Sequence, residues 1–166
     1  EEELSRIIFE YGEERFARKI AKLICENRKT KPITTTFELV ALIRRAYPER
    51  ASKHPAKKTF QAIRIEVNRE LEVLENAMSK AVELLKVGGR LGIITFHSLE
   101  DRIVKNKFKD LATACKCPKD IPICMCGGVK KFELITRKPI IPVEDELKNN
   151  NRAHSSKLRI LERILD

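Results

Sequence analysis

Apolar residues in the first 47 positions recur every three to four residues, which is the spacing of one buried helix face. The repeat is carried by Phe16, Ile20, Leu23 and Ile24. Pro32 predicts the end of that helix, because proline has no amide hydrogen to donate. Thr35 and Glu38 have the spacing of a capping box and predict a second helix, which Pro48 stops. Residues 1–47 therefore predict a small helical unit.

A second stripe of apolar residues steps by three and four through residues 60–85 and predicts one long helix with a buried face. The stripe consists of Phe60, Ile63, Val67, Leu71, Leu74, Met78, Ala81 and Leu85. Gly88-Gly89 predicts the stop, where a left-handed residue is usually needed. Residues 91–96 are apolar on both faces, which predicts a strand inside a parallel sheet that helices cover.

The remaining pattern predicts a helix and two closing strands. Ser98 to Asp101 has the spacing of a helix N-cap, and apolar residues follow at helical spacing. Residues 131–135 and 157–164 predict two strands that form an antiparallel edge, joined through an acidic turn at residues 144–147. The order of elements predicts an α/β fold with a helical segment in front.

The net charge of the chain indicates what kind of partner it binds. Lys and Arg total 34 against 24 Asp and Glu, a net charge of +10. Such a surplus favours a polyanion such as RNA, although a basic surface without a partner explains it equally well. No apolar run approaches the roughly 18 residues that cross a membrane, so we expect no membrane partner. The chain opens on Glu1 within a helical pattern, from which we expect it to be cut from something longer.

A polar corner follows the apolar strand. In open α/β sheets ligands bind at the carboxyl ends of strands, which makes this corner the leading candidate for a site. Its candidates are His97, Ser98, Glu100, Asp101 and Arg102. A structural interpretation competes: Ser98 and Asp101 as caps of the next helix, Arg102 as the partner of a carboxylate, and His97 as a hydrogen-bonded turn residue.

Four cysteines cluster in the loop 115–126. They are Cys115, Cys117, Cys124 and Cys126. Two pairs of thiolates are able to form a tetrahedral zinc site, which would be structural because it lies away from the polar corner in sequence. Unliganded thiols and disulfides are the alternatives. Cys25, alone on a predicted helix, is expected only to pack.

Residues 84–105, which contain Phe-His-Ser-Leu-Glu-Asp-Arg at 96–102, resemble the family of 16S ribosomal RNA cytosine-N4 methyltransferases of the MraW or RsmH type. Residues 59–71, 135–139 and 152–159 resemble the same family in the same order, and residues 2–16 resemble the start of its helical insertion. The Gly-Gly-Arg of residues 88–90 is common to many methyltransferases, whereas the string at 96–102 is specific.

The resemblance implies the C-terminal half of a class I, Rossmann-like methyltransferase sheet with an inserted all-helical domain. Residues 1–56 would be most of that insertion with a basic linker, and residues 57–166 the C-terminal half of the methyltransferase domain. The implied reaction moves a methyl group from S-adenosylmethionine to the N4 amine of a cytidine in 16S rRNA or the small ribosomal subunit, in the cytoplasm. None of the six glycines forms a Gly-x-Gly turn between strand and helix. We therefore assign no cofactor-binding residue and expect the piece alone to be inactive.

The enzyme must hold the base out of its stack and accept a proton from N4. His97 or a carboxylate is the candidate acceptor, or His97 and Ser98 only orient the base. The candidate RNA contacts are Lys53, His54, Lys57, Lys58, Arg64, Asn68, Arg137 and Arg152. The loop that contains Lys53, His54, Lys57 and Lys58 is equally consistent with a linker that only connects two segments. Arg64 and Asn68 are equally consistent with residues that brace their own helix.

Two other functions fit the residues. A non-enzymatic RNA-binding module fits the charge and the absence of a glycine-rich turn, and a metal-stabilised interaction domain fits the four cysteines. Neither the pattern nor the resemblance predicts an oligomeric state.

Overall fold

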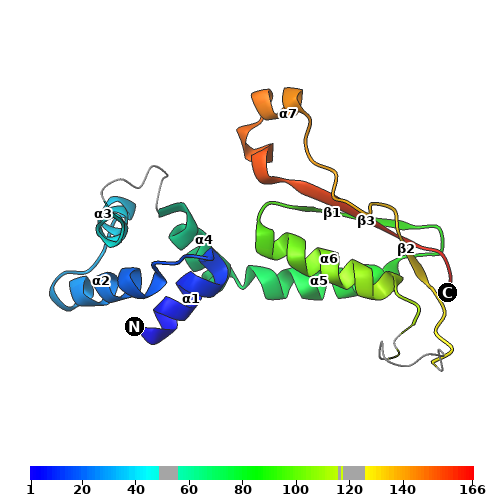
Figure 1. Cartoon of the computed structure of the whole chain (residues 1–166), viewed down its shortest axis with the longest axis horizontal. Helices are drawn as coiled ribbons and strands as arrows, with labels where there is room; N and C mark the ends of the chain where they lie inside the picture. The colour runs from blue at the N-terminus through cyan, green and yellow to red at the C-terminus, as the bar shows by residue number, and fades with distance from the viewer. Residues whose placement is uncertain (49–55, 116, 118–125) are drawn as a thin grey trace. The chain divides into compact units, whose positions relative to one another are not determined.

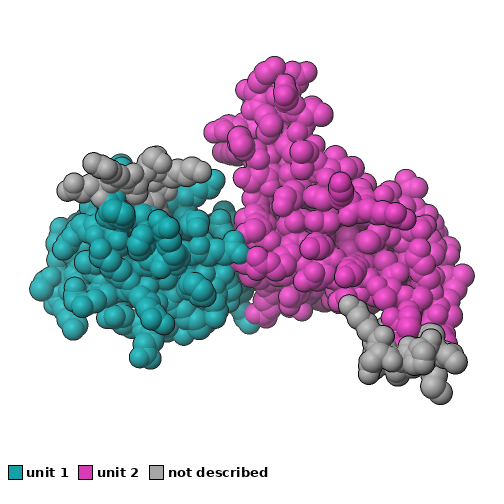
Figure 2. Space-filling model, in the orientation of Figure 1, with its two compact units in different colours: residues 1–70 teal, residues 71–166 magenta. Residues whose placement is uncertain are grey.

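The computed structural model describes residues 1–48, 56–115, 117 and 126–166. The chain forms two compact units, residues 1–70 and 71–166, and each is described by itself (Figure 2). Three predicted site residues, Lys53, His54 and Cys124, lie outside the described residues. Within the described ranges, no helix is both long enough and apolar enough to cross a membrane.

The described part of the first unit is built from helices (Figure 1). These are α1 (Glu2–Gly12), α2 (Ala17–Thr30), α3 (Thr36–Ala46) and α4 (Ala56–Asn68). Ile8, Ile20 and Ile43 are fully buried and form the centre of the unit's core. The predicted helical unit is confirmed, and α2 ends just before Pro32 as expected.

The capping box predicted for α3 is also confirmed. Thr35 is the N-cap, and its hydroxyl oxygen accepts a hydrogen bond from the Glu38 amide at 3.2 Å. The Glu38 carboxylate in turn accepts from the Thr35 amide at 3.1 Å and from Lys31 Nζ at 2.7 Å. The Lys31 hydrogen bond, helped by the amides of Thr34 and Thr35, lowers the pKa of Glu38 to about 2.

The single long helix predicted over residues 60–85 is wrong, because the chain forms α4 and then α5 (Glu70–Leu84). Arg69 between them has a φ of 52°, and this left-handed conformation ends α4. Arg64 and Asn68 donate hydrogen bonds across the break to the Glu70 carboxylate, at 3.0 and 3.1 Å. One left-handed residue leaves the spacing of apolar residues in the sequence unchanged, so periodicity did not reveal the break.

The second unit holds a three-stranded sheet (Figure 1). After α5 its elements are β1 (Arg90–Thr95), α6 (Ser98–Ala112), β2 (Phe132–Leu134), α7 (Glu144–Asn149), a 3₁₀ helix (Asn151–Ser155) and β3 (Lys157–Arg163). The strand order is β1-β3-β2, and β3 runs antiparallel to both neighbours. The two predicted closing strands are therefore confirmed, and the predicted acidic turn is the short helix α7.

Helices α5 and α6 cover one face of this sheet (Figure 1). Met78 of α5, Val104 and Phe108 of α6 and Leu161 of β3 are buried together there. Among the described residues β1 differs from the strand that was predicted: it pairs only with β3, and Ile94 on its other face is 58% exposed. In the described part of the chain, side chains of the core therefore cover only one of the two apolar faces of β1.

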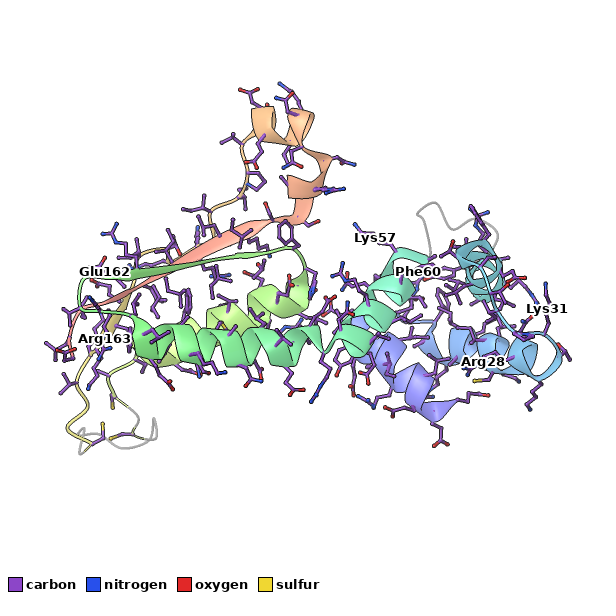
Figure 3. The ribbon with its side chains drawn as sticks, turned by 180° about the vertical axis from the view of Figure 1, so that it is seen from behind. Arg28, Lys31, Lys57, Phe60, Glu162 and Arg163 are labelled. Atoms are coloured by element: carbon purple, nitrogen blue, oxygen red, sulfur yellow. The ribbon has the colours of Figure 1, made fainter. Side chains whose placement is uncertain are left out.

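The turn between α5 and β1 is fastened to the end of β3, where Figure 3 labels Glu162 and Arg163. Gly88 has a φ of 79°, as predicted for the Gly-Gly stop, although α5 already ends at Leu84. The Gly88 amide donates to the carbonyl of Arg163 at 2.7 Å, and the Arg163 guanidinium donates to the carbonyl of Leu85 at 2.8 Å. These bonds fix where β1 begins.

Candidate functional site

The candidate corner begins where β1 ends. Thr95, its last residue, is buried, and its hydroxyl donates to the Lys157 carbonyl of β3 at 3.3 Å. Thr95 and Lys157 are paired in the antiparallel register. The sheet therefore fixes the point at which the chain turns from β1 into α6.

His97 is the N-cap of α6, which corrects the prediction that Ser98 and Asp101 cap this helix. Its Nδ1 accepts a hydrogen bond from the Glu100 amide at 3.3 Å. The Glu100 carboxylate accepts from the amides of Phe96 and His97, at 2.8 and 3.2 Å. The same reciprocal bonds that Ser or Thr usually makes are here made by an imidazole, so the helix begins one residue earlier than a serine cap would place it.

The Nδ1 bond also fixes the chemistry of the ring. A nitrogen that accepts an amide hydrogen carries no proton itself, so the neutral His97 ring holds its proton on Nε2. This Nε2 lies 3.4 Å from Glu100 Oε1, and the His97 side chain is only 8% exposed. To accept another proton at Nδ1, the ring would first have to give up the bond that caps α6.

Asp101 belongs to a buried ion pair that sequence reasoning missed. Arg159 of β3 donates two hydrogen bonds to its carboxylate, from Nε at 2.7 Å and from Nη2 at 3.2 Å. Lys157 Nζ adds a third at 3.2 Å. The Arg159 bonds, opposed by burial and helped by Lys157, lower the pKa of Asp101. Asp101 is therefore a fixed anion that joins α6 to β3.

The structure brings some predicted corner residues together and separates others. Asp101 is buried and meets β3 through Arg159, and His97 and Glu100 are half-buried beside it on the first turn of α6. Ser98 and Arg102 are exposed on the same helix. The buried and half-buried side chains fix the conformation of the corner. Ser98 and Arg102 are the side chains of this turn that a ligand is able to reach.

A basic cavity of about 110 Å³ lies between α6 and the segment after β2. Arg137, predicted as an RNA contact, lines it together with Lys105 and Lys109 of α6. Arg159 also lines it, and none of its lining residues in the described part of the chain is acidic. Lys105 and Lys109 were missed, although their spacing of four residues places them on one face of a helix.

The other predicted RNA contacts are less concentrated. Lys57, labelled in Figure 3, and Arg152 are exposed. Lys58 Nζ donates to the carbonyl of Glu13 at 2.8 Å, which joins α4 to the end of α1. Arg64 and Asn68 hold Glu70, as the brace interpretation expected.

Three of the four predicted metal ligands lie together. One sulfur from each of Cys115, Cys117 and Cys126 lies within 4.8 Å of the other two. The cluster sits in the loop between α6 and β2, away from the His97 corner in sequence. Cys25 lies half-buried on α2, where its sulfur accepts a hydrogen bond from Arg28 Nη2 at 3.2 Å.

Comparisons with known proteins agree over nearly the whole chain. The family model described as the MraW methylase family matches residues 1–164. "Ribosomal RNA small subunit methyltransferase H" of Fusobacterium nucleatum subsp. nucleatum is 87% identical over 166 residues, covering 100% of this chain and 53% of the relative. The proteins of that name from Caldicellulosiruptor saccharolyticus and Carboxydothermus hydrogenoformans are 56% and 55% identical, each covering 99% of this chain and 54% and 53% of their own length. The chain spans about half the length of the curated relatives it matches.

Proposed function

Because this chain belongs to the MraW methylase family, we propose that it forms part of an enzyme that methylates the N4 amine of a cytidine in 16S rRNA with S-adenosylmethionine. The match over residues 1–164 carries this proposal. The names of the relatives, which are small-subunit ribosomal RNA methyltransferases, support the substrate. A cytoplasmic location, where small ribosomal subunits are assembled, belongs to the same proposal.

We further propose that the sheet of the second unit is one side of a class I methyltransferase sheet, with β1 as its fifth strand and β2 and β3 as its last two. The strand order, with the reversed strand β3 between β1 and β2, supports this. So does the uncovered face, on which Ile94 is 58% and Ile140 51% exposed. The other half of the protein would pair with β1 and cover this face. The helices before α4 would then be the inserted domain, with its boundary proposed near residue 56, although α4 itself lies in the same compact unit, residues 1–70.

The cofactor-binding residues are proposed to lie in that other half. The six glycines of this chain include no Gly-x-Gly turn that links a strand to a helix. Such a turn brings a helix N-terminus and close backbone amides to a cofactor. The residues of this chain therefore do not form a cofactor site by themselves. No reaction step proposed here depends on contacts between these residues and the cofactor.

His97 is proposed to shape and orient the pocket for the base. Its Nδ1 is engaged with the Glu100 amide, so the ring is better placed to position a partner than to remove a proton. Asp101 is held as an anion by Arg159 and serves the same purpose by fixing the first turn of α6 on the sheet. Ser98 and Arg102, which are exposed on that turn, are the proposed contacts to substrate.

The cavity beside Arg137 is proposed as a contact for the RNA backbone. Arg137, Lys105 and Lys109 bring positive charge from two separate segments to one small cavity. Phosphate contacts of this kind position the nucleic acid and release counterions, so their loss weakens binding and lowers its salt dependence. Arg152 and Lys57 are exposed and are proposed as further contacts of the same type.

The test uses the intact protein with isotopically labelled methyl donor, offered either purified small subunits or naked 16S rRNA. We expect N4-methylcytidine in the nuclease digest, identified by mass spectrometry. Label on another base or on protein contradicts the proposal, and tight RNA binding without any transfer favours the alternative of a non-enzymatic RNA-binding module. The preferred of the two substrates tells whether free RNA or the assembled subunit is recognised.

The RNA contacts are tested with a Lys105→Ala, Lys109→Ala double variant. We expect weaker binding of the subunit, with a salt slope lower by about two, and unchanged affinity for the methyl donor. Lys80→Ala with Lys86→Ala, which removes one exposed lysine of α5 and one just after it, is the matched control. Equal loss of RNA affinity in both variants means that overall charge, and not this cavity, binds the RNA.

A further inference from the structure

We propose that Cys115, Cys117 and Cys126 bind one zinc ion, which fixes the loop between α6 and β2. Their thiol sulfurs lie within 4.8 Å of one another. Cys115 and Cys126 are exposed, so an ion is able to reach them from solvent. This site is independent of the proposed methyl transfer and would hold whichever reaction the protein performs.

The spacing of the sulfurs fits one ion. A tetrahedral zinc ion holds each thiolate at about 2.3 Å, which separates two sulfur ligands of the same ion by about 3.8 Å. The Sγ atoms of Cys115 and Cys126 are 3.8 Å apart. A disulfide needs a sulfur–sulfur distance of about 2.0 Å and joins only two sulfurs, so it does not account for the convergence of a third.

The backbone next to the cluster is built for this close approach. Gly127 has a φ of 56°, a left-handed turn that glycine adopts without strain. A side chain on Gly128 would place its Cβ 1.9 Å from the carbonyl oxygen of Ala114, so only glycine fits there. The same Cβ position is 3.3 Å from Cys126 Sγ. The two ends of the loop therefore cross at Gly128, directly beside the sulfurs.

The location of the cluster indicates a structural role. Cys126 lines a surface cavity together with Thr113, just after α6, and Phe132, the first residue of β2. Phe132 is part of the core beneath the sheet. An ion bound where the two ends of the loop meet would connect the end of α6 to the start of β2. It would thereby reduce the entropy that a long connection loses on folding.

Sulfur is the ligand that zinc prefers in structural sites. The three described thiols leave one position of the tetrahedron, and the predicted fourth ligand, Cys124, lies outside the described residues. The zinc content of the intact protein therefore tests whether the site exists. The zinc content of variants that lack one cysteine tests how many ligands the site has.

The first experiment measures zinc in the intact protein by plasma mass spectrometry after purification under reducing conditions. We expect about one zinc ion per chain in the wild type and in Cys25→Ser, and a loss of zinc in Cys117→Ser. Cys25 is the matched control, because it is a half-buried cysteine of the first unit. Wild-type protein that carries no metal, and takes up none when zinc is added, overturns the proposal.

A second experiment keeps every sulfur. Gly128→Ala should force the crossing at Ala114 apart and weaken zinc binding by about tenfold or more, as changes beside a metal site commonly do. Cobalt added to zinc-depleted wild type should give the intense visible absorption of a tetrahedral cobalt–thiolate centre. Circular dichroism reports whether each variant is folded. If folded Gly128→Ala binds zinc as the wild type does, the crossing does not organise the site; if cobalt gives no thiolate spectrum, the sulfurs are not the ligands.

Methyl transfer is measured separately on the same samples. Zinc bound by a protein without methyltransferase activity would support the metal site and contradict only the proposed function. Activity without zinc would do the reverse.

Discussion

Two helices of this protein, α3 and α6, begin with the same set of hydrogen bonds in opposite surroundings. Thr35 and Glu38 form the capping box of α3, and His97 and Glu100 form that of α6. A basic side chain lies beside an acid at both: Lys31 beside Glu38, with side chains 71% and 31% exposed, and Arg159 beside Asp101, with side chains 10% and 12% exposed. The capping bonds are alike, whereas the ion pair involves the capping-box carboxylate at α3 and the neighbouring Asp101 at α6, and it is buried only at α6.

Burial determines how much each helix N-terminus contributes to stability. An exposed ion pair is screened by water and usually adds little to stability, whereas removing one partner of a buried pair leaves a charge without compensation. A cap on an exposed helix affects mainly that helix. At α6 the cap and the ion pair also fix the end of β1, where we place the substrate.

The largest effect is expected from Asp101→Asn. The substitution leaves the Arg159 guanidinium buried without its counter-charge and should lower the free energy of unfolding by about 3–5 kcal/mol. Denaturant unfolding of the intact protein measures it. Asp110→Asn, on the exposed side of the same helix, is the control and should change the free energy by less than about 0.5 kcal/mol. Equal effects would mean that burial does not separate the two carboxylates.

A double variant, Asp101→Leu with Arg159→Met, tests whether the buried charge is the cause. Replacing both partners by apolar residues removes the uncompensated charge, so most of the lost stability should return. A double variant as unstable as Asp101→Asn would show that packing around the pair, and not its charge, is responsible.

A smaller effect on stability and a larger one on turnover are expected at His97. His97→Ala removes the cap and should cost about 1–2 kcal/mol, while His97→Asn keeps an N-cap acceptor and should restore most of that. If the imidazole also orients the base, both variants should turn over small-subunit RNA far more slowly with little change in affinity for the methyl donor. His154→Ala, an exposed histidine, is the control. Full turnover in His97→Asn would limit His97 to capping.

The two capping boxes differ in how far the sequence predicts them. The α3 box was predictable because threonine is a favoured N-cap and glutamate follows three residues later. At α6 the same spacing exists between His97 and Glu100, but histidine is not a favoured cap, so the sequence pattern favours Ser98 instead. Most of the order of helices and strands follows from periodicity and was predicted, but the break between α4 and α5 at Arg69 and the helix α7 were not.

Contacts between distant segments were not predictable in this way. Arg159 was seen only as a polar position in an alternating strand, and its pairing with Asp101 requires β3 to lie next to β1. That pairing joins residues far apart in the sequence, which local patterns do not encode. The convergence of Lys105, Lys109 and Arg137 on one cavity has the same origin. The cysteines were found because they cluster in sequence as well as in space.

A moderate effect is expected at the exposed box. Thr35→Ala removes the hydroxyl that accepts from the Glu38 amide and should cost about 1 kcal/mol, expressed as faster hydrogen exchange at the start of α3. Thr35→Ser keeps the acceptor and is the control. The exchange of amides in α6 should not change, since α6 belongs to the other unit. Faster hydrogen exchange in both helices would mean that the N-termini of α3 and α6 are not independent of each other.

The smallest effect on stability is expected from Lys31→Met, and its clearest readout is a titration. The hydrogen bond from Lys31 is the largest cause that lowers the pKa of Glu38 to about 2, so the variant should raise that pKa toward the ordinary range. A carboxyl group with a lowered pKa stabilises the folded state above its unfolded pKa, and this contribution is lost as the pH falls through the folded pKa. In Lys31→Met the folded pKa lies closer to the unfolded one, so the contribution should be smaller and its loss complete at a higher pH than in the wild type, with stability near neutral pH almost unchanged because the pair is exposed. NMR titration of the Glu38 carboxyl carbon measures the shift, and Lys29→Met, an exposed lysine at the end of α2, is the control. A Glu38 pKa that stays near 2 without Lys31 would mean that the backbone amides of the capping box alone hold the carboxylate charged, and the parallel between Lys31 and Arg159 would then fail.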